Sequence, residues 1–388
     1  MFYILIGVLV WARMLFFKKI ENQYLDKGLF VLLWVNFIYY ATTMPYTASQ
    51  DYLAYKRSYI YQINEFEPGY NLLARWSFYH GVTYDNFKTI FLILAITFLM
   101  IGILRLAKTY LITVGVYMIV PFFLDAIQIR FLLMTGLVVF GVSFLKKRSF
   151  VRVMFATMLI VVAAQFHSSG YFFLIVVAFY LMSDGVRDRI LITTTPISLM
   201  VGLYLRYVPA GRTIILNSIA TILSKLIGRS TSVNRVYSFY TAGKASLFIA
   251  MLLLAILLIF VVHRYYQFQV MYKFASNNFD IVQSVQLLLI IIVPVISTFN
   301  EFSRLLRVVV IFAIILFSNM IADMDIMFEK KKIFRQFLII GVVGIGLATY
   351  EFYGTMTYRQ IPIILKLEPA PAIPPDSVGN LFNNNEIN

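Results

Sequence analysis

Three arginines stand where long apolar runs of the sequence begin or end, and this residue type suits the binding of phosphate. The planar guanidinium group donates paired hydrogen bonds to phosphate oxygens and keeps its charge at every physiological pH. A charge beside an apolar run is costly to keep there, so its position points to function. We therefore expect that a phosphate or a diphosphate can be clamped by Arg130, Arg304 and Arg307.

Three other side chains can take a proton from a reacting hydroxyl group. The unperturbed pKa of histidine lies near neutrality, which suits His167 for general acid–base work. Asp51 and Glu67 are carboxylates that can act as the base, bind sugar hydroxyls or orient an arginine. These residue types leave open which of the three is the base. The sequence has no hydride-cofactor motif, phosphate-binding loop or nucleophile elbow.

Polar and aromatic neighbours complete the candidate site. Gln128 and Glu301 can bind the substrate beside the arginines, and Tyr55 and Tyr70 offer rings that stack on sugar faces. Each residue type also has a purely structural use. An arginine at a helix end often only anchors the helix, and a tyrosine-rich stretch can be an interfacial aromatic belt. The run Glu67-Pro68-Gly69 can be no more than a turn before a helix.

The composition places these residues in a membrane protein. Of 388 residues, 61% are hydrophobic and only 13% are charged, about half the charged share of a soluble domain. This is too little polar surface for a cytosolic enzyme, a secreted domain or a disordered chain. The absence of cysteine excludes disulfides and thiolate sites, and only three histidines argue against a multi-histidine metal centre.

About twelve apolar runs are long enough to cross a bilayer, which needs about 20 residues or somewhat fewer where the bilayer thins. We predict an all-α polytopic membrane protein whose spans lie near 2–17, 28–44, 87–104, 109–124, 129–145, 150–166, 170–183, 190–206, 246–262, 280–298, 306–323 and 336–352. The first run contains Arg13 and no small-residue cleavage site, so it is expected to be an uncleaved span. Residues 1–360 form one membrane domain, and residues 361–388 form an irregular tail.

Basic residues mark one side of this predicted arrangement. Every connection after an odd-numbered span carries lysine or arginine, from Lys18 and Lys19 after the first to Lys330, Lys331 and Lys332 after the eleventh. Because basic connections stay in the cytoplasm, both termini are expected outside. The polar residues of the candidate site then all fall on the outer side, in four connections that hold Asp51 and Glu67; Asp125, Gln128 and Arg130; His167; and Asn300, Glu301, Arg304 and Arg307. The basic connections therefore read as topology signals, and they give little reason to expect nucleic acid as a partner.

Two longer outer segments, about 45–86 and 207–245, are expected beside the site. The first contains two helix starts, at Ser49–Tyr52 and at Pro68, since proline is favoured in the first turn of a helix. In the second, apolar residues recur at helical spacing from Ile215 to Leu226, which predicts an interfacial amphipathic helix or a lid.

Taken in order along the chain, these residues resemble the signature of the EpsG family, Wzy-type polymerases of bacterial exopolysaccharides. The matching elements are Asp51 with Tyr52 and Tyr55, Glu67-Pro68-Gly69-Tyr70, Gln128-Ile129-Arg130, Phe166-His167-Ser168-Ser169, and the pair Arg304 and Arg307. The Glu-Pro-Gly-Tyr motif with its upstream aspartate is the most specific of them. The resemblance covers roughly residues 25–325 and leaves the Asn-rich tail outside.

The resemblance implies a reaction and its partners. It implies kinship with O-antigen ligases and with the GT-C type of membrane glycosyltransferases. Such a polymerase transfers a growing glycan from undecaprenyl diphosphate to the non-reducing-end hydroxyl of a new lipid-linked repeat unit. The reaction takes place at the outer (periplasmic or extracellular) face of the bacterial cytoplasmic membrane. A flippase supplies the units, and a chain-length regulator is a further expected partner. The resemblance implies neither a nucleotide-sugar donor nor an obligatory metal or other cofactor.

Three other functions fit part of the pattern. A glycan ligase would use the same donor with a different acceptor, and the Glu-Pro-Gly-Tyr element favours the polymerase. A transporter of lipid-linked oligosaccharide often shows paired halves and charges at mid-membrane, whereas here the polar groups gather at one face. A membrane acyltransferase could use His167, but an arginine-rich set suits a diphosphate better.

Overall fold

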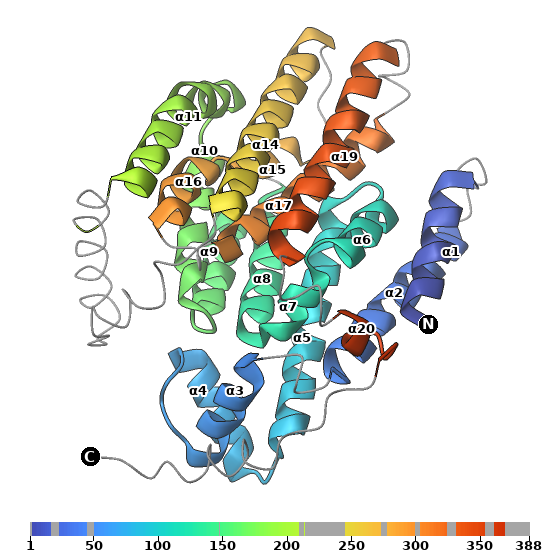
Figure 1. Ribbon diagram of the computed structural model, residues 1–388, viewed down its shortest axis with the longest axis vertical. Helices are drawn as coiled ribbons and strands as arrows, with labels where there is room; N and C mark the ends of the chain where they lie inside the picture. The colour runs from blue at the N-terminus through green and yellow to red at the C-terminus, as the bar shows by residue number, and fades with distance from the viewer. Residues whose placement is uncertain are drawn as a thin grey trace.

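A computed structural model describes residues 2–16, 23–44, 50–146, 148–208, 213, 245–272, 278–298, 303–323, 331–353 and 361–368. This part of the chain is an elongated bundle of helices and contains no strand, in agreement with the predicted all-α class (Figure 1). The first helices are α1 (Phe2–Phe16), α2 (Gln23–Thr42), α3 (Gln50–Tyr61), α4 (Pro68–Tyr79), α5 (Tyr84–Leu106) and α6 (Tyr110–Ile119). The middle of the chain forms α7 (Phe122–Ile127), α8 (Ile129–Val142) with the 3-10 helix η2 (Ser143–Lys146), α9 (Phe150–Ala164), the 3-10 helix η3 (Ser168–Phe173), α10 (Leu174–Leu181) and α11 (Asp184–Tyr207). The last helices are α14 (Ala245–Tyr272), α15 (Phe279–Gln286), α16 (Leu289–Thr298), α17 (Ser303–Ala322), α19 (Lys331–Tyr353) and α20 (Ile361–Ile364).

Each predicted span coincides with a helix or a pair of consecutive helices. By length and composition, six of these are able to cross a membrane: α5, α8 with η2, α11, α14, α15 with α16, and α17. Shorter apolar helices occur in α1, α6, α9, η3 with α10, and α19. The structure therefore supports a polytopic membrane protein, while the number of twelve crossings and the kinship with GT-C enzymes stay predictions.

One predicted span is interrupted just before the candidate site. The run 109–124 was expected to be a single helix, but α6 ends at Ile119 and α7 starts at Phe122, with Pro121 as its N-cap. Proline has no backbone N–H and clashes with the preceding turn, which favours a break at Pro121, although Pro196 and Pro294 are accommodated inside α11 and α16. The break places Asp125 in a separate short helix directly before α8.

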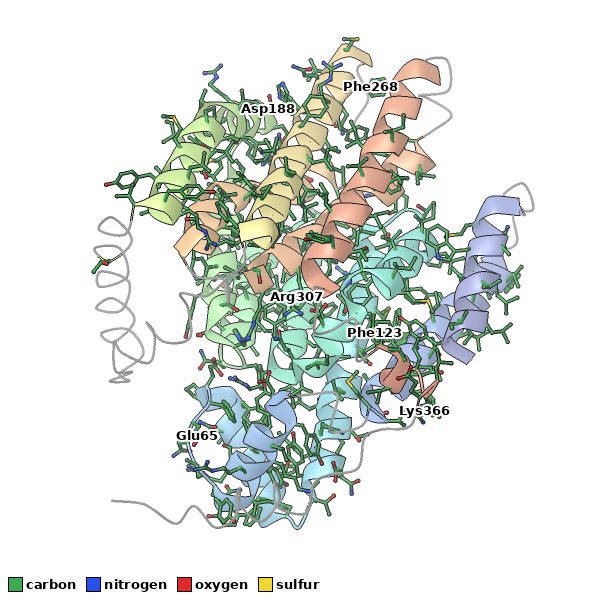
Figure 2. All side chains as sticks on the ribbon, viewed as in Figure 1. Glu65, Phe123, Asp188, Phe268, Arg307 and Lys366 are labelled. Carbon is green, nitrogen blue, oxygen red and sulfur yellow. The ribbon has the colours of Figure 1, made fainter. Side chains whose placement is uncertain are left out.

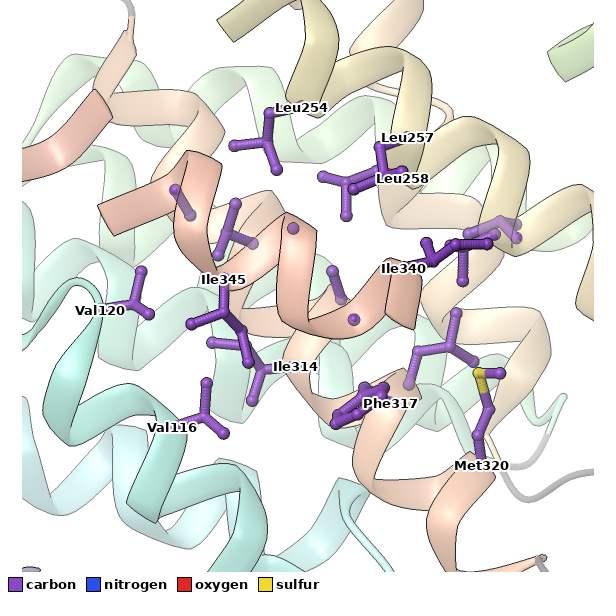
Figure 3. Close-up of a pocket in the computed structure, with 18 residues that line it drawn as sticks. Val116, Val120, Leu254, Leu257, Leu258, Ile314, Phe317, Met320, Ile340 and Ile345 are labelled. Atoms are coloured by element: carbon purple, nitrogen blue, oxygen red, sulfur yellow. The ribbon is translucent and has the colours of Figure 1, made fainter. Parts of the chain in front are cut away.

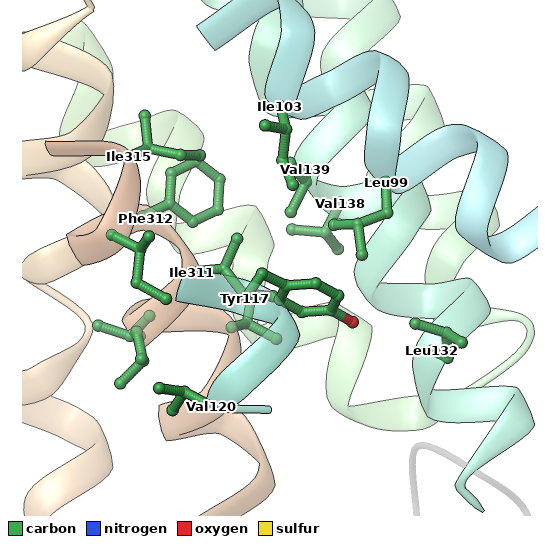
Figure 4. Packing of buried hydrophobic residues seen from close by; sticks show 14 of the residues in the cluster. Leu99, Ile103, Tyr117, Val120, Leu132, Val138, Val139, Ile311, Phe312 and Ile315 are labelled. Atoms are coloured by element: carbon green, nitrogen blue, oxygen red, sulfur yellow. The ribbon is translucent and has the colours of Figure 1, made fainter. Parts of the chain in front are cut away.

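The centre of the bundle is formed by α5, α6, α8 and α17. Small residues bring α5 and α8 close together, because a Cβ on Gly102 would lie 2.8 Å from the Phe140 nitrogen. Tyr117 of α6 is buried among apolar side chains of α5, α8 and α17, including Leu99 and Val138 (Figure 4). This tight centre holds the helix ends that carry the candidate site at fixed distances.

The described helix ends that border the predicted inner connections lie toward the end of the bundle opposite to α3 and α4 (Figure 1). In Figure 2, Asp188 lies near one end, Glu65 near the other and Arg307 between them. Basic residues of the Asp188 end are paired: Lys108 with Asp323 at 2.5 Å, and the fully buried Arg187 with Asp184. The predicted inner and outer sides of the protein are thus separated in space. The assignment of one of them to the cytoplasm stays a prediction.

An apolar cavity of about 60 Å³ lies between α6, α14, α17 and α19 (Figure 3). All of its lining residues are apolar, among them Val116, Leu258, Ile314 and Gly344. It offers no group for acid–base work or for binding a charge, so it is not part of the candidate site. The second predicted outer segment and the tail beyond residue 368 lie almost entirely outside the described residues.

Candidate active site

Glu67 closes the loop between α3 and α4, and its carboxylate reaches two other elements. Glu67 is the N-cap of α4 in extended conformation, and its side chain makes no capping hydrogen bond. Instead the carboxylate forms an ion pair with Arg130 at the start of α8. It also accepts a hydrogen bond from the Ser168 N–H, with 3.1 Å between nitrogen and oxygen. Three segments that are distant in sequence meet at this one carboxylate.

Two glycines make this meeting possible. The Gly69 N–H donates a hydrogen bond of 2.9 Å to the Gln165 carbonyl, and a Cβ on Gly69 would lie only 2.8 Å from that oxygen. A Cβ on Gly170 would lie 2.7 Å from the Ala164 Cα atom. Since real side chains essentially never approach so closely, both positions require glycine. The turn at His167 is thereby held against the start of α4 and the end of α9.

Arg130 is enclosed by aromatic rings. Its guanidinium carbon lies 4.1 Å from the ring centre of Phe66, 5.2 Å from that of Tyr55 and 5.9 Å from that of Tyr70. Arginine stacks favourably on aromatic faces, so the rings hold the guanidinium group in place. Tyr55 and Tyr70 were expected to contact substrate, but both are buried against Arg130. In this structure they position Arg130, and direct contact with a sugar stays a prediction.

His167 lies in the turn between α9 and η3 and is half-buried. Burial, together with the charges of Arg130, Arg304 and Arg307, lowers the pKa of His167 well below its usual value. The imidazole is therefore neutral at neutral pH. Its ring lies edge-on to Phe131 of α8, with 5.5 Å between the ring centres.

The hydrogen bonds of His167 indicate which ring nitrogen carries the proton. Nδ1 accepts a hydrogen bond from the Ser169 N–H at 3.4 Å and lies 2.6 Å from the Ser169 hydroxyl oxygen. A neutral imidazole whose Nδ1 accepts must carry its proton on Nε2, a tautomer assigned here from this hydrogen-bond pattern. His167 then offers a hydrogen-bond donor from Nε2 rather than a base.

Arg307 of α17 belongs to a buried polar network. Its Nη1 atom lies 3.0 Å from the Oδ1 atom of Asp125, and its Nη2 atom donates a hydrogen bond to the Gln128 side chain. The Tyr117 hydroxyl donates to the second Asp125 oxygen at 3.0 Å. The guanidinium carbon also lies 4.5 Å from the ring centre of Phe131. Because Phe131 contacts His167 as well, Arg307 and His167 border the same ring.

Arg304 lies one turn before Arg307 on α17 and is half-buried. Its positive charge contributes, after burial and Arg130, to the lowered pKa of His167. The same charge acts on Tyr55, whose pKa is raised mainly by burial. Charge effects weaken with distance, so these two effects indicate that Arg304 lies near both His167 and Tyr55. The charges of all three predicted arginines thus act on His167.

Of the remaining predicted site residues, one is described but forms no hydrogen bond or ion pair with this arrangement, and the other lies outside the described residues. Asp51 lies one turn before Tyr55 on α3, and its negative charge raises the pKa of that tyrosine. No side chain in the described part of the chain forms an ion pair with Asp51. Glu301 lies outside the described residues, as does its neighbour Asn300. Their predicted roles in the site stay predictions.

The described site has a surplus of positive charge. Three arginines face two carboxylates, Glu67 and Asp125, beside the neutral His167. Such a site suits an anion with several oxygens. Within the described ranges, no group of three or more His, Asp or Glu side chains is arranged to hold a metal ion.

The sequence profile of the EpsG family matches residues 29–359, most of the chain. The chain belongs to the EpsG family. This family of Wzy-type exopolysaccharide polymerases was predicted from the motifs, and the prediction is confirmed. Membership together with the apolar helices indicates a membrane protein of polysaccharide biosynthesis. No curated protein and no solved structure matches the chain.

This EpsG-family site contains three aromatic residues that the sequence did not single out, Phe66, Tyr117 and Phe131, and it contains Asp125, which was expected there without a defined role. Asp125 carried a signal, because a carboxylate inside the apolar run Phe122–Ile127 must find a partner. The three aromatic residues carried no signal, since the chain contains 36 phenylalanines and 26 tyrosines. Only the packing of the helices shows which of them border an arginine.

Proposed function

We propose that this EpsG-family protein is a polymerase that uses repeat units linked to undecaprenyl diphosphate. It transfers the growing glycan to the non-reducing-end hydroxyl of a new unit at the outer face of the bacterial cytoplasmic membrane. One observation supports the proposal: Glu67 joins Arg130 to the turn at His167, and the charges of Arg130, Arg304 and Arg307 all act on that histidine, although these residues come from four distant segments. The predicted topology places all of these segments on the outer side.

The arginines suit the leaving group of this reaction. A diphosphate is already stable as an anion, so its departure needs stabilised charge more than a strong acid. Arg130, Arg304 and Arg307 supply this charge, and the Nε2–H group of His167 adds a neutral donor. Removing one donor of this kind typically lowers the rate by about 10²–10³-fold.

The acceptor hydroxyl needs a base as its oxygen attacks the anomeric carbon of the donor sugar. The new carbon–oxygen bond forms while the bond to the phosphate oxygen breaks, and the hydroxyl proton passes to a carboxylate. The tautomer of His167 favours Glu67 or Asp51 as this carboxylate. A positioned base typically contributes about 10²–10⁴-fold to the rate.

The proposed reaction defines the partners. The donor and the acceptor are both lipid-linked repeat units, supplied by a flippase, and a chain-length regulator acts on the product. Because the energy resides in the lipid diphosphate, neither a nucleotide sugar nor a metal ion is required. Nucleic acid has no place in the reaction.

Substitution of His167 in cells that make the glycan tests the proposal. His167→Ala should abolish polymer while single repeat units persist on their carrier, at normal membrane levels of the protein. His167→Gln is the matched control, because its amide can still donate a hydrogen bond, and it should retain more polymer than His167→Ala. A wild-type ladder of chain lengths in His167→Ala would contradict the assignment.

A further inference from the structure

Glu67 is bound by donors that would also bind a phosphate. Its carboxylate oxygens take the ion pair of Arg130 and the hydrogen bond of the Ser168 N–H at 3.1 Å. A guanidinium group and a backbone N–H are both common phosphate ligands. We propose that Glu67 is a displaceable counter-ion, which a phosphate of the lipid diphosphate replaces on Arg130 and Ser168. This inference rests on the proposed function, and it adds a mechanism by which binding of the donor regulates the site.

The two ion pairs of the site differ in their access to a ligand. The side chains of Arg130 and Glu67 are 13% and 15% exposed, whereas those of Arg307 and Asp125 are 3% and 0% exposed. Asp125 is held further by the Tyr117 hydroxyl at 3.0 Å. An arriving anion can therefore reach Arg130 but cannot take the place of Asp125.

Glu67 can leave Arg130 without moving the backbone around it. Its side chain makes no capping hydrogen bond to α4, so only rotation about side-chain bonds is needed. The following residues stay fixed, because Pro68 begins the helix and the Gly69 N–H is bonded to the Gln165 carbonyl at 2.9 Å. The exchange replaces one anion by another at an unchanged set of donors.

The exchange also links donor binding to the chemistry. A diphosphate linked at both ends carries two negative charges, which with Asp125 balance the three arginines once Glu67 has left. The released carboxylate is then available to take the proton of the acceptor hydroxyl as its oxygen bonds to the anomeric carbon. The sugar–phosphate bond breaks, and the lipid diphosphate departs. Glu67 returns to Arg130 afterwards, so the base is ready only when the donor is bound.

Binding of diphosphate to the purified full chain in detergent tests the exchange. The probes are inorganic pyrophosphate and farnesyl diphosphate, with the dissociation constant measured by calorimetry. Glu67→Gln should bind both about tenfold more tightly than the wild type, because no carboxylate competes for Arg130. Glu65→Gln, which removes the same charge from the exposed part of the loop, should bind as the wild type does.

Thermal unfolding gives a matched comparison of the two pairs. Glu67→Ala and Asp125→Ala each leave an arginine without its carboxylate, so both should lower Tm. Pyrophosphate should restore the Tm of Glu67→Ala but not that of Asp125→Ala, where the space is sealed. Equal restoration in both variants, or in neither, would overturn the inference.

If the variants do not fold, a labelling experiment on the wild-type protein tests the exchange. Carbodiimide modification of Glu67, followed by mass spectrometry, should increase when pyrophosphate is added. Unchanged or reduced labelling, or no gain in affinity for Glu67→Gln, would overturn the exchange while leaving the proposed function intact. A wild-type protein that binds neither probe would instead contradict the diphosphate clamp itself.

Discussion

Arg307 forms an ion pair with Asp125 and Arg130 forms one with Glu67, and the two ion pairs have different roles. Asp125 in α7 is fully buried, so a ligand has no direct access to its carboxylate. A buried charge is retained only where it is paired and hydrogen-bonded, which Arg307 and Tyr117 provide here. We infer that Asp125 is a positioning residue that fixes the direction of Arg307.

Asp125→Asn tests this role at the residue scale. Burial raises the pKa of Asp125 to about 6, although Arg307 and the Tyr117 hydroxyl oppose the shift. Below that pH the carboxyl group is protonated and resembles asparagine, so wild-type activity should fall on the acid side of pH 6. Asp125→Asn should lower the turnover at pH 7 by up to about 10²-fold, through misplacement of Arg307.

The pH profile separates positioning from mere stability. Asp125→Asn should lose the acid-side decrease near pH 6, because it has no proton to gain there. Tyr117→Phe keeps the ring but removes one hydrogen bond to Asp125, so it should move the decrease toward higher pH. An unchanged profile in both variants would show that Asp125 does not control Arg307.

At the scale of the elements, the site depends on how closely α4 approaches the end of α9. Pro68 and Gly69 start α4, and the Gly69 N–H binds the Gln165 carbonyl just before His167. This contact brings Glu67 to the Ser168 N–H. The Glu-Pro-Gly-Tyr motif therefore combines a charge, a helix start, a close approach and a buried ring in four consecutive residues.

Gly69→Ala tests the close approach. The added methyl group would lie 2.8 Å from the Gln165 oxygen, so α4 must move away from the His167 turn. We expect loss of most polymerase activity and destabilisation by about 1–3 kcal/mol, as is typical of overpacking. Gly28→Ala is the control, because nothing lies within 4 Å of a Cβ at that position. Normal activity of Gly69→Ala would contradict the importance of the contact.

At the scale of the whole molecule, the α3–α4 segment that carries Glu67 and the described helix ends that border the predicted inner connections lie toward opposite ends of the bundle. Glu65 lies near the end formed by α3 and α4, and Asp188 lies at the other (Figure 2). The chain contains no cysteine, so a single introduced thiol can be labelled without background. Glu65→Cys should react with a membrane-impermeant maleimide in right-side-out vesicles. Ser183→Cys should react only after permeabilisation, and the reverse pattern would invert the predicted topology.

The pattern of apolar runs in the sequence predicts both the helices and the residues of the candidate site. The length of an apolar run predicts a membrane span, and a charge beside such a run predicts function. The helices α8 and α17 are therefore recognised together with Arg130, Arg304 and Arg307. The ion pairs between side chains of different helices cannot be predicted in this way, because they depend on how the helix faces pack. Neither the ion pair of Glu67 with Arg130 nor that of Asp125 with Arg307 has a signal in the spacing of the residues. The burial of Tyr55 and Tyr70 against Arg130 is of the same kind.

The most direct test of the polymerase is a reaction with purified components. The protein is incubated with synthetic undecaprenyl-diphosphate repeat units, without nucleotide sugar and in the presence of a metal chelator. We predict a ladder of chain lengths with release of undecaprenyl diphosphate, and its loss in Arg130→Ala. A folded wild-type protein that makes no product longer than one repeat unit would contradict the account.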